Sequence, residues 1–242
     1  MSKTVVITSG GTSEYIDKVR KITNSGTGKL GSIIADEFGN RDDIEKIFYI
    51  HTPKAFLPKT EKVICIQVTD TNSVKDAVEK VLIENKIDIF IHTMAISDYY
   101  VDYVSTIEIL SEEMKNRNII ETFKNPIYKL DNSSKLSSSE DNLVVVLKQT
   151  PKIIGIIKQL SPKTILIGFK LLENVTKEHL FGVSRRLMEK NNCDYVVAND
   201  LRDIKNGNHK AFLLSKNGNE IEMNGKEEIA RILARNILYK KA

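Results

Sequence analysis

The chain has no tryptophan, only two cysteines among 242 residues, and little net charge, because 36 Lys and Arg residues face 32 Asp and Glu residues. Two cysteines cannot form a disulfide framework and are too few for a cysteine-based metal site. A net charge of +4 without a basic block argues against nucleic acid as a partner. No apolar stretch approaches the roughly 20 residues that span a bilayer, and the first residues lack the apolar core of a signal peptide. We therefore expect a cytoplasmic protein with no membrane partner.

The residues that are present predict a folded α/β protein. Hydrophobic residues make up 41% and charged residues 28%, which is ordinary for a globular domain and excludes a disordered chain. Short continuous apolar runs alternate with segments of helical periodicity, as in a parallel sheet covered on both faces. The predicted strands are residues 4–8, 46–51, 62–68, 87–92, 143–147, 164–169 and 193–198. The predicted helices are residues 29–38, 73–85, 151–160, 175–191 and 226–239. This alternation predicts a Rossmann-like, mainly parallel sheet covered by helices.

Two regions break the alternation. Residues 98–142 are polar and have no clean period, so we expect a flap or an arm that meets another subunit. Residues 201–223 predict a late β-hairpin whose turn is Asn217-Gly218. Because no internal repeat or linker is visible, we expect residues 1–242 to form one domain with an excursion at about 98–142.

A glycine-rich segment after the first predicted strand is the most informative part of the sequence. Gly26, Gly28 and Gly31 match G-x-G-x-x-G, but roughly 17 residues separate them from the strand that this dinucleotide motif should follow directly. The phosphate-loop motif also fails, because it requires glycine at position 23 and Ser or Thr at position 30. Both motifs bring backbone N–H groups to phosphate at a helix start. A loop of this length is unusual without a function, so phosphate binding is the favoured interpretation.

The same segment resembles the opening of the phosphopantothenate–cysteine ligase family. The matching residues are Thr8, Gly10, Thr12, Glu14, Asp17, Val19, Arg20, Ile22, Asn24, Gly28, Lys29 and Gly31. Similar matches follow at residues 94–99 (Met-Ala-Ile-Ser-Asp-Tyr), 150–153 (Thr-Pro-Lys-Ile), 168–169 (Gly-Phe) and 197–200 (Val-Ala-Asn-Asp). The resemblance covers essentially the whole chain. It implies the stand-alone bacterial form, with a phosphopantothenoylcysteine decarboxylase as a separate partner chain.

Several positions depart from the family pattern. Gly26-Thr27-Gly28 stands where the family has Ser-Ser-Gly, and Lys152 stands in place of an aspartate. Of the family's lysine-rich segment only Lys135 is kept. Two basic residues four apart on a late helix fit Arg186 and Lys190 only with one residue inserted. These departures leave the roles around residues 136–138 and 186–190 open.

The resemblance implies a ligation in two steps. A nucleoside triphosphate, CTP with ATP as the alternative, activates the carboxylate of 4′-phosphopantothenate as an acyl-nucleotide, and the amine of L-cysteine then displaces CMP. Mg²⁺ or Mn²⁺ would accompany the nucleotide. Asn24 would donate to the acyl oxygen, and Lys135, in a polar loop that we expect to be mobile, would neutralise phosphate charge. Asp98 would serve the nucleotide through a metal, the ribose or the base. The implied nucleotide-binding residues are Gly10, Ser25, Gly26, Thr27, Gly28, Met94, Ala95, Asp98, Pro151, Ile153, Phe169, Arg186 and Lys190.

Two other functions remain possible from the sequence. An NAD(P)-dependent oxidoreductase would use the same sheet, although its glycines are displaced and its acidic residue after the second strand is missing. A nucleotide-binding sensor without catalysis would keep the glycines but would not need Asn24 or Lys135. We further expect a homodimer through the apolar residues of the excursion, and we expect Cys65 and Cys193 to be buried in strands. Those apolar residues are Tyr99, Tyr100, Val101, Tyr103, Val104, Ile107, Ile109 and Leu110.

Overall fold

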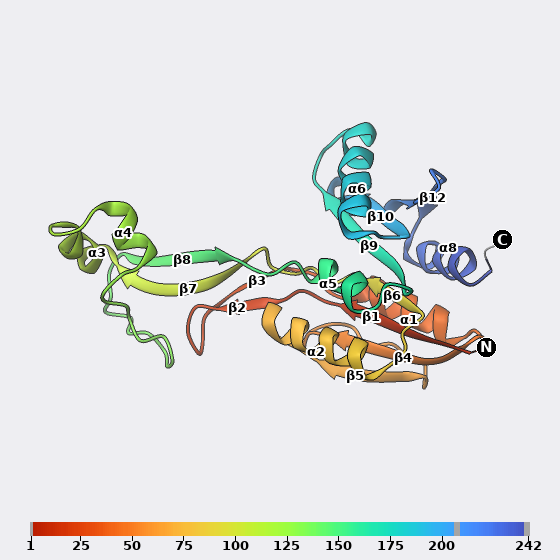
Figure 1. Ribbon diagram of the computed structural model, residues 1–242, viewed down its shortest axis with the longest axis horizontal. Coiled ribbons are helices and arrows are strands. Elements are labelled where there is room, and N and C mark those ends of the chain that lie inside the picture. The colour runs from red at the N-terminus through yellow and green to blue at the C-terminus, as the bar shows by residue number, and fades with distance from the viewer. Residues whose placement is uncertain (1, 206–208, 240–242) are drawn as a thin grey trace.

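An eight-stranded sheet forms the body of the protein in the computed structural model, which describes residues 2–205 and 209–239 (Figure 1). Its strand order is β12-β11-β10-β9-β6-β1-β4-β5, and neighbours from β10 to β5 are parallel. The parallel strands are β1 (Lys3–Ser9), β4 (Ile44–His51), β5 (Val63–Gln67), β6 (Ile89–His92), β9 (Ile165–Leu172) and β10 (Tyr195–Asp200). The structure confirms the predicted α/β class.

Helices cover both faces of this sheet. One apolar cluster joins the sheet to α2 (Thr71–Glu84), α5 (Ile153–Leu160) and α6 (Lys177–Asn191). The other joins it to α1 (Lys29–Gly39) and α8 (Lys226–Leu238). The central strands β1 and β6 contribute side chains to both clusters, which explains why their sequences are continuously apolar. Among the described residues, no helix has the length and apolar character needed to cross a membrane.

The predicted excursion is an arm that extends from the body (Figure 1). It consists of an antiparallel ribbon of β7 (Tyr99–Thr106) and β8 (Leu143–Gln149), with α3 (Ile107–Met114) and α4 (Ile119–Lys124) at its far end. The strand predicted at 143–147 therefore belongs to this ribbon and not to the main sheet, which is a correction. The apolar residues expected at an interface are divided. Tyr103, Val104 and Leu110 are buried in this structure, whereas Tyr99 and Ile107 are exposed.

Other boundaries also differ from the prediction. A short hairpin of β2 (Ser13–Tyr15) and β3 (Lys21–Thr23) occupies the long loop after β1, where no strand was predicted. The late hairpin of β11 (Lys210–Ser215) and β12 (Glu220–Asn224) is confirmed, with its turn at Gly218, but it begins after a short helix, α7 (Leu201–Lys205). The predicted range 201–223 also includes residues 206–208, which lie outside the described chain.

Candidate active site

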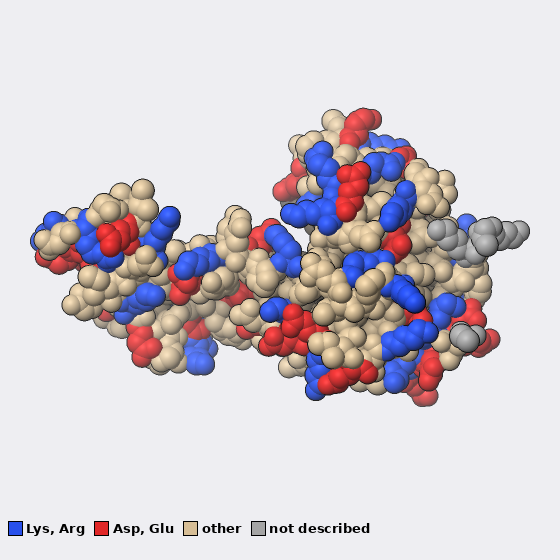
Figure 2. All heavy atoms as spheres, in the orientation of Figure 1, with Lys and Arg blue, Asp and Glu red and all other residues tan. Residues whose placement is uncertain are grey.

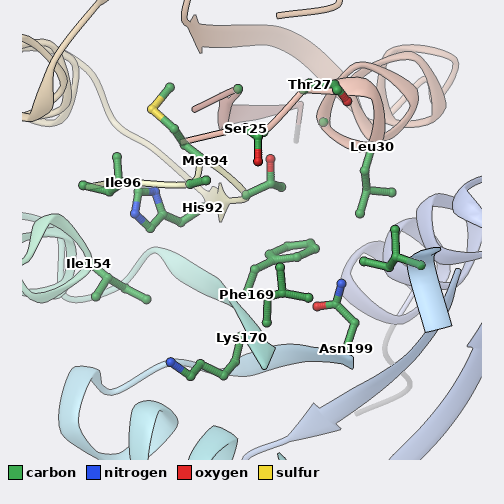
Figure 3. Close-up of a pocket in the computed structure, with 18 of the residues that line it drawn as sticks. Ser25, Thr27, Leu30, His92, Met94, Ile96, Ile154, Phe169, Lys170 and Asn199 are labelled. Carbon is green, nitrogen blue, oxygen red and sulfur yellow. The ribbon is translucent and has the colours of Figure 1, made fainter. Parts of the chain in front are cut away.

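A cavity of about 880 Å³ opens at the carboxyl ends of the parallel strands (Figure 3). In the sheet, β4 and β5 lie on one side of β1, and the later strands β6, β9 and β10 lie on its other side. This reversal leaves a crevice between β1 and β6, the place where open α/β sheets bind ligands. Residues of the loop before α1, the loop after β6, and the ends of β9 and β10 line the cavity.

The loop between β1 and α1 is held close to the sheet. The Ala95 N–H donates to the Gly10 carbonyl at 2.9 Å, the Thr12 N–H to Ala95 at 3.1 Å, and the Asn24 N–H to Thr12 at 3.0 Å. A Cβ atom at Gly11 would lie 2.1 Å from the carbonyl oxygen of Asn24, so only glycine allows this approach. The loop between β1 and α1 is long because its backbone leaves the sheet and then returns to it. Its length was the reason to predict phosphate binding.

The N-terminus of α1 faces the cavity, and within the described chain the side-chain contact recorded at its first turn is a long one, from the Lys29 N–H to Thr27 Oγ1 at 3.4 Å. Its N-cap, Gly28, has φ 71°, a left-handed conformation that favours glycine. Thr27, Leu30 and Gly31, around this first turn, also line the cavity. The N–H groups of Leu30 and Gly31, which have no side-chain partner among the described residues, and the positive end of the helix dipole attract an anion.

Lysine side chains add positive charge to this cavity. Asp98 is the single carboxylate among the described lining residues, and Lys152 forms an ion pair with it. Figure 2 shows Lys and Arg side chains on the visible surface of the body, with Asp and Glu side chains interspersed among them. The cavity therefore suits a ligand with several negative charges. The lining lysines are Lys29, Lys152, Lys170, Lys190 and Lys226.

The residues present do not build a resident metal site at Asp98. Its side chain is 71% exposed and is neutralised by Lys152. Within residues 2–205 and 209–239, no group of three His, Cys, Asp or Glu side chains could hold a metal ion. A divalent ion that enters with a nucleoside triphosphate would be part of the substrate, since Mg²⁺ commonly takes phosphate oxygens and water as ligands.

The structure brings ten of the predicted site residues together. The cavity is lined by Gly10, Ser25, Gly26, Thr27, Gly28, Met94, Ala95, Asp98, Phe169 and Lys190. Asn24 lies beside it and donates from Nδ2 to the Ala95 carbonyl at 3.1 Å. Pro151, Ile153 and Arg186 are not in the lining: Ile153 is buried in the core, and Arg186 is exposed on α6 one turn from Lys190.

Lys135 lies outside this cavity, in a loop whose backbone is anchored. The buried Asp17 carboxylate accepts the N–H of Arg20 at 2.6 Å and that of Leu136 at 3.1 Å. Asn132 Nδ2 donates to the Ile16 carbonyl at 2.9 Å. The N–H of Arg20 is the main cause that lowers the pKa of Asp17. In this structure, hydrogen bonds therefore hold the backbone on both sides of Lys135, while its side chain is exposed. The expected mobility of the loop stays a prediction.

Sequence reasoning gave no site role to three cavity lysines or to the two described cavity histidines, His92 and His209. Lys29 belongs to the glycine-rich motif, whereas Lys170 and Lys226 are isolated in sequence, and the topology brings all three lysines to one site. His92 ends an apolar strand, and burial lowers its pKa to about 4. The cysteine prediction was half right: Cys193 is buried, and burial raises its pKa to about 12, but Cys65 is exposed on the edge strand β5.

These features define a Rossmann-like α/β domain with an anion-accepting cavity at the switch point of its sheet. The chain belongs to the family described as the DNA/pantothenate metabolism flavoprotein C-terminal domain, which matches residues 1–126 and 128–240. The family resemblance predicted from the motifs is thereby confirmed. The DNA/pantothenate metabolism flavoprotein from Streptococcus pneumoniae has a crystal structure that is 35% identical, covers 100% of both chains and superposes with a TM-score of 0.85.

Curated relatives are longer than this chain. The coenzyme A biosynthesis bifunctional protein CoaBC of Thermococcus kodakarensis is 29% identical over 88% of this chain and 45% of its own length. The chain thus spans about half the length of that relative. A Cab2 mutant in complex with phosphopantothenate-cysteine shares the fold at a TM-score of 0.68 and 18% identity, covering 98% of this chain and 85% of that one.

Proposed function

We propose that this protein is a ligase of coenzyme A biosynthesis that joins 4′-phosphopantothenate and L-cysteine to give 4′-phosphopantothenoyl-L-cysteine. The observation that carries the proposal is the N-terminus of α1, where the Leu30 and Gly31 N–H groups have no side-chain partner among the described residues. It faces a cavity lined by five lysines at the switch point. Triphosphate and phosphopantothenate are both polyanions, and such a site suits them. Membership of the family, with its bifunctional coenzyme A relatives, supports this substrate class.

In the proposed first step, a carboxylate oxygen of phosphopantothenate attacks the α-phosphorus of CTP. The bond to the β-phosphate breaks, pyrophosphate leaves, and an acyl-cytidylate forms. Lys135 and the cavity lysines would offset the phosphate charge that develops. Phe169, at the sheet end of the cavity, would pack against the base. Mg²⁺ or Mn²⁺ would enter with the nucleotide as part of the substrate, and ATP remains the alternative nucleotide.

In the second step the cysteine amine attacks the acyl carbon and loses a proton, and CMP leaves with the electron pair of the acyl–oxygen bond. Asn24 would donate to the acyl oxygen as it becomes an oxyanion. This requires the Asn24 amide to exchange its present acceptor, the Ala95 carbonyl, for the ligand. Because the anhydride forms on the substrate, the reaction needs no serine or cysteine nucleophile.

The proposal includes a homodimer in the cytoplasm, with a phosphopantothenoylcysteine decarboxylase as a functional partner. Exposed Tyr99, Ile107 and Ile119 on the arm provide apolar surface for a second copy. Whether Lys135 would serve its own subunit or the partner's depends on how the arms pair. Light scattering at micromolar protein is expected to give twice the chain mass, and a monomeric mass would contradict the dimer.

The test of the function is pyrophosphate release from purified protein with phosphopantothenate, L-cysteine, Mg²⁺ and either CTP or ATP. Steady release that requires all components is the expected result, and omission of cysteine should reduce it to one burst per site. Nucleotide binding without any pyrophosphate would favour a sensor. Oxidation of NAD(P)H without pyrophosphate would favour the oxidoreductase alternative.

A further inference from the structure

His92 places a polar ring in an otherwise apolar part of the cavity wall. It is the last residue of β6, is 8% exposed and lines the cavity. Figure 3 shows its imidazole beside the side chains of Met94 and Ile96, with Ile154 on the neighbouring segment. A polar group in such surroundings is costly unless a hydrogen-bond partner uses it.

The hydrogen bonds of Thr8 fix which nitrogen of His92 carries the proton. Thr8 is fully buried, and its hydroxyl lies 2.8 Å from His92 Nδ1 and accepts the N–H of Met94 at 3.3 Å. Within the described chain, His92 Nδ1 and the Met94 N–H are the hydrogen-bond partners of the Thr8 hydroxyl. Because Met94 N–H can only donate, the Thr8 O–H needs His92 Nδ1 as its acceptor. Nδ1 is then unprotonated, and the proton of the neutral ring sits on Nε2.

Nε2 is the ring nitrogen that remains available to a ligand. Thr8 engages Nδ1, and His92 lines the cavity, so a ligand there can be bonded only through Nε2. Among the described residues no acceptor bonds Nε2. Burial lowers the pKa of His92 to about 4, which keeps the imidazole neutral near pH 7.

We propose that His92 is a specificity-determining residue, whose Nε2–H donates a hydrogen bond to an uncharged acceptor, a carbonyl oxygen or ring nitrogen, of the ligand in this cavity. The proposal rests on the proposed function for the identity of that ligand. A neutral donor among apolar side chains matches an uncharged acceptor, whereas the phosphates match the lysines and the start of α1. Two substrates carry uncharged acceptors: the nucleotide, in its base, and phosphopantothenate, in its amide.

The tautomer can be tested without any activity. Nitrogen-15 NMR of the whole protein labelled at histidine distinguishes a protonated ring nitrogen from an unprotonated one. We expect His92 to show a protonated Nε2 and an unprotonated Nδ1 at pH 7. A protonated Nδ1, or a doubly protonated ring, would overturn the proposal even if the ligase activity is present.

Substitutions then identify the acceptor. His92→Phe removes the donor, and we expect about a tenfold rise in KM for one substrate with kcat changed less than about twofold. A rise in KM for CTP assigns the acceptor to the base, and a rise for phosphopantothenate assigns it to the amide. His92→Gln keeps an N–H near the position of Nε2 and should recover most of the loss. Equal KM values for wild type and His92→Phe with both substrates would overturn the proposal.

His51→Gln is the matched control. His51 also ends a buried strand, and its Nδ1 lies 3.1 Å from the Thr52 carbonyl, but it does not line the cavity. The His51→Gln substitution should leave the KM values for CTP and for phosphopantothenate unchanged. If the wild-type protein releases no pyrophosphate at all, the proposed function fails. Binding of CTP and of phosphopantothenate to wild type and His92→Phe, measured by calorimetry, then still decides the role of His92.

Discussion

The body and the arm of this molecule are stabilised in different ways. In the body, whole strands such as β1 and β6 are buried between two helical layers, and their apolar side chains fill both cores. In the arm, one two-stranded ribbon carries two short helices, and much of the order comes from carboxylates that accept backbone N–H groups. Glu113 accepts those of Ile127 and Tyr128, and Asp17 accepts that of Leu136 where the arm meets the β2–β3 hairpin.

This difference bears on the proposed site, because its residues come partly from the body and partly from the arm. The body supplies an anion cradle made largely of backbone, which tight packing holds in place. The arm supplies Lys135, which is held by a few hydrogen bonds. Substitutions should therefore separate global stability, which depends on the body, from the geometry around Lys135, which depends on the arm.

Truncation of one buried side chain in each region gives the largest contrast. Ile91, in β6, is fully buried, so Ile91→Ala should lower the free energy of unfolding by about 2–5 kcal/mol. Leu136, in the anchored loop, is 5% exposed, and Leu136→Ala should cost about 2 kcal/mol or less because that site can relax. Urea unfolding followed by circular dichroism measures both. Equal losses would indicate that arm and body unfold as one unit.

Asn24→Ala should separate the two half-reactions. In the proposed site, phosphate would be bound through backbone N–H groups that this change leaves in place, so carboxylate activation should persist. Loss of one donor at the acyl oxygen typically costs about 10²–10³ in rate. The acyl-nucleotide should accumulate on the enzyme and be visible by mass spectrometry, with a single burst of pyrophosphate.

Asn219→Ala, at an exposed position before β12, is the control and should behave as wild type. The opposite result for Asn24→Ala would be no pyrophosphate but normal use of added acyl-nucleotide. That outcome would move Asn24 to the first step and contradict its assigned role.

Lys135→Gln keeps the length of the side chain but removes its charge. Pyrophosphate release should fall by about 10²-fold, the lower end for a group that stabilises developing charge. Folding should be unchanged, because the side chain is exposed. Lys124→Gln, an exposed lysine on α4, is the matched control. Near-normal turnover would transfer the role to another cation, with Lys129 and the cavity residue Lys152 as the next candidates.

The sequence predicted the body well, because strands that are buried on both faces are continuously apolar and can be recognised from that pattern. Runs such as residues 4–8 and 87–92 are continuously apolar, and each coincides closely with an observed strand, β1 and β6. The sequence pattern of the arm was less informative. The strand β8 is apolar like a core strand, so residues 143–147 were assigned to the main sheet. The partners of β8 in β7 lie 37 to 50 positions away in the sequence, from Thr106 with Leu143 to Tyr99 with Gln149, and the composition of β8 does not encode this pairing.

The same limit explains which site residues were predicted. The glycines, Asp98 and Phe169 lie in local motifs, and all of them line the cavity. Lys170 and Lys226 carry no local signal, since β9 and α8 meet the rest of the site only in the folded chain. Lys29 lies within the glycine-rich motif, but the motif did not assign it a role. The anchoring of Leu136 by Asp17 spans 119 positions and was likewise invisible.

Asp17→Asn should have the smallest effect, confined to the junction of arm and body. The neutral amide accepts the Leu136 N–H more weakly than a carboxylate does. Hydrogen exchange of the Leu136 amide should become about tenfold faster, with little change in exchange at core amides of β6. Exchange followed by NMR measures both in one sample. Equal acceleration in β6 would mean that Asp17 stabilises the whole fold and not the junction alone.

The pH dependence of the same amide makes the test sharper. The folded-state pKa of Asp17 lies below its ordinary value, so ionised Asp17 contributes stability that is present above the unfolded pKa of about 4. That stability is lost as pH falls through the lowered folded pKa. In the wild type, protection of Leu136, corrected for intrinsic exchange, should therefore be constant near neutrality and decrease below about pH 4. In Asp17→Asn it should be low at every pH, because no proton is left to bind. A pH-dependent loss in the variant would assign the acid sensitivity to another carboxylate of the arm, such as Glu113, whose pKa is also lowered by backbone N–H groups.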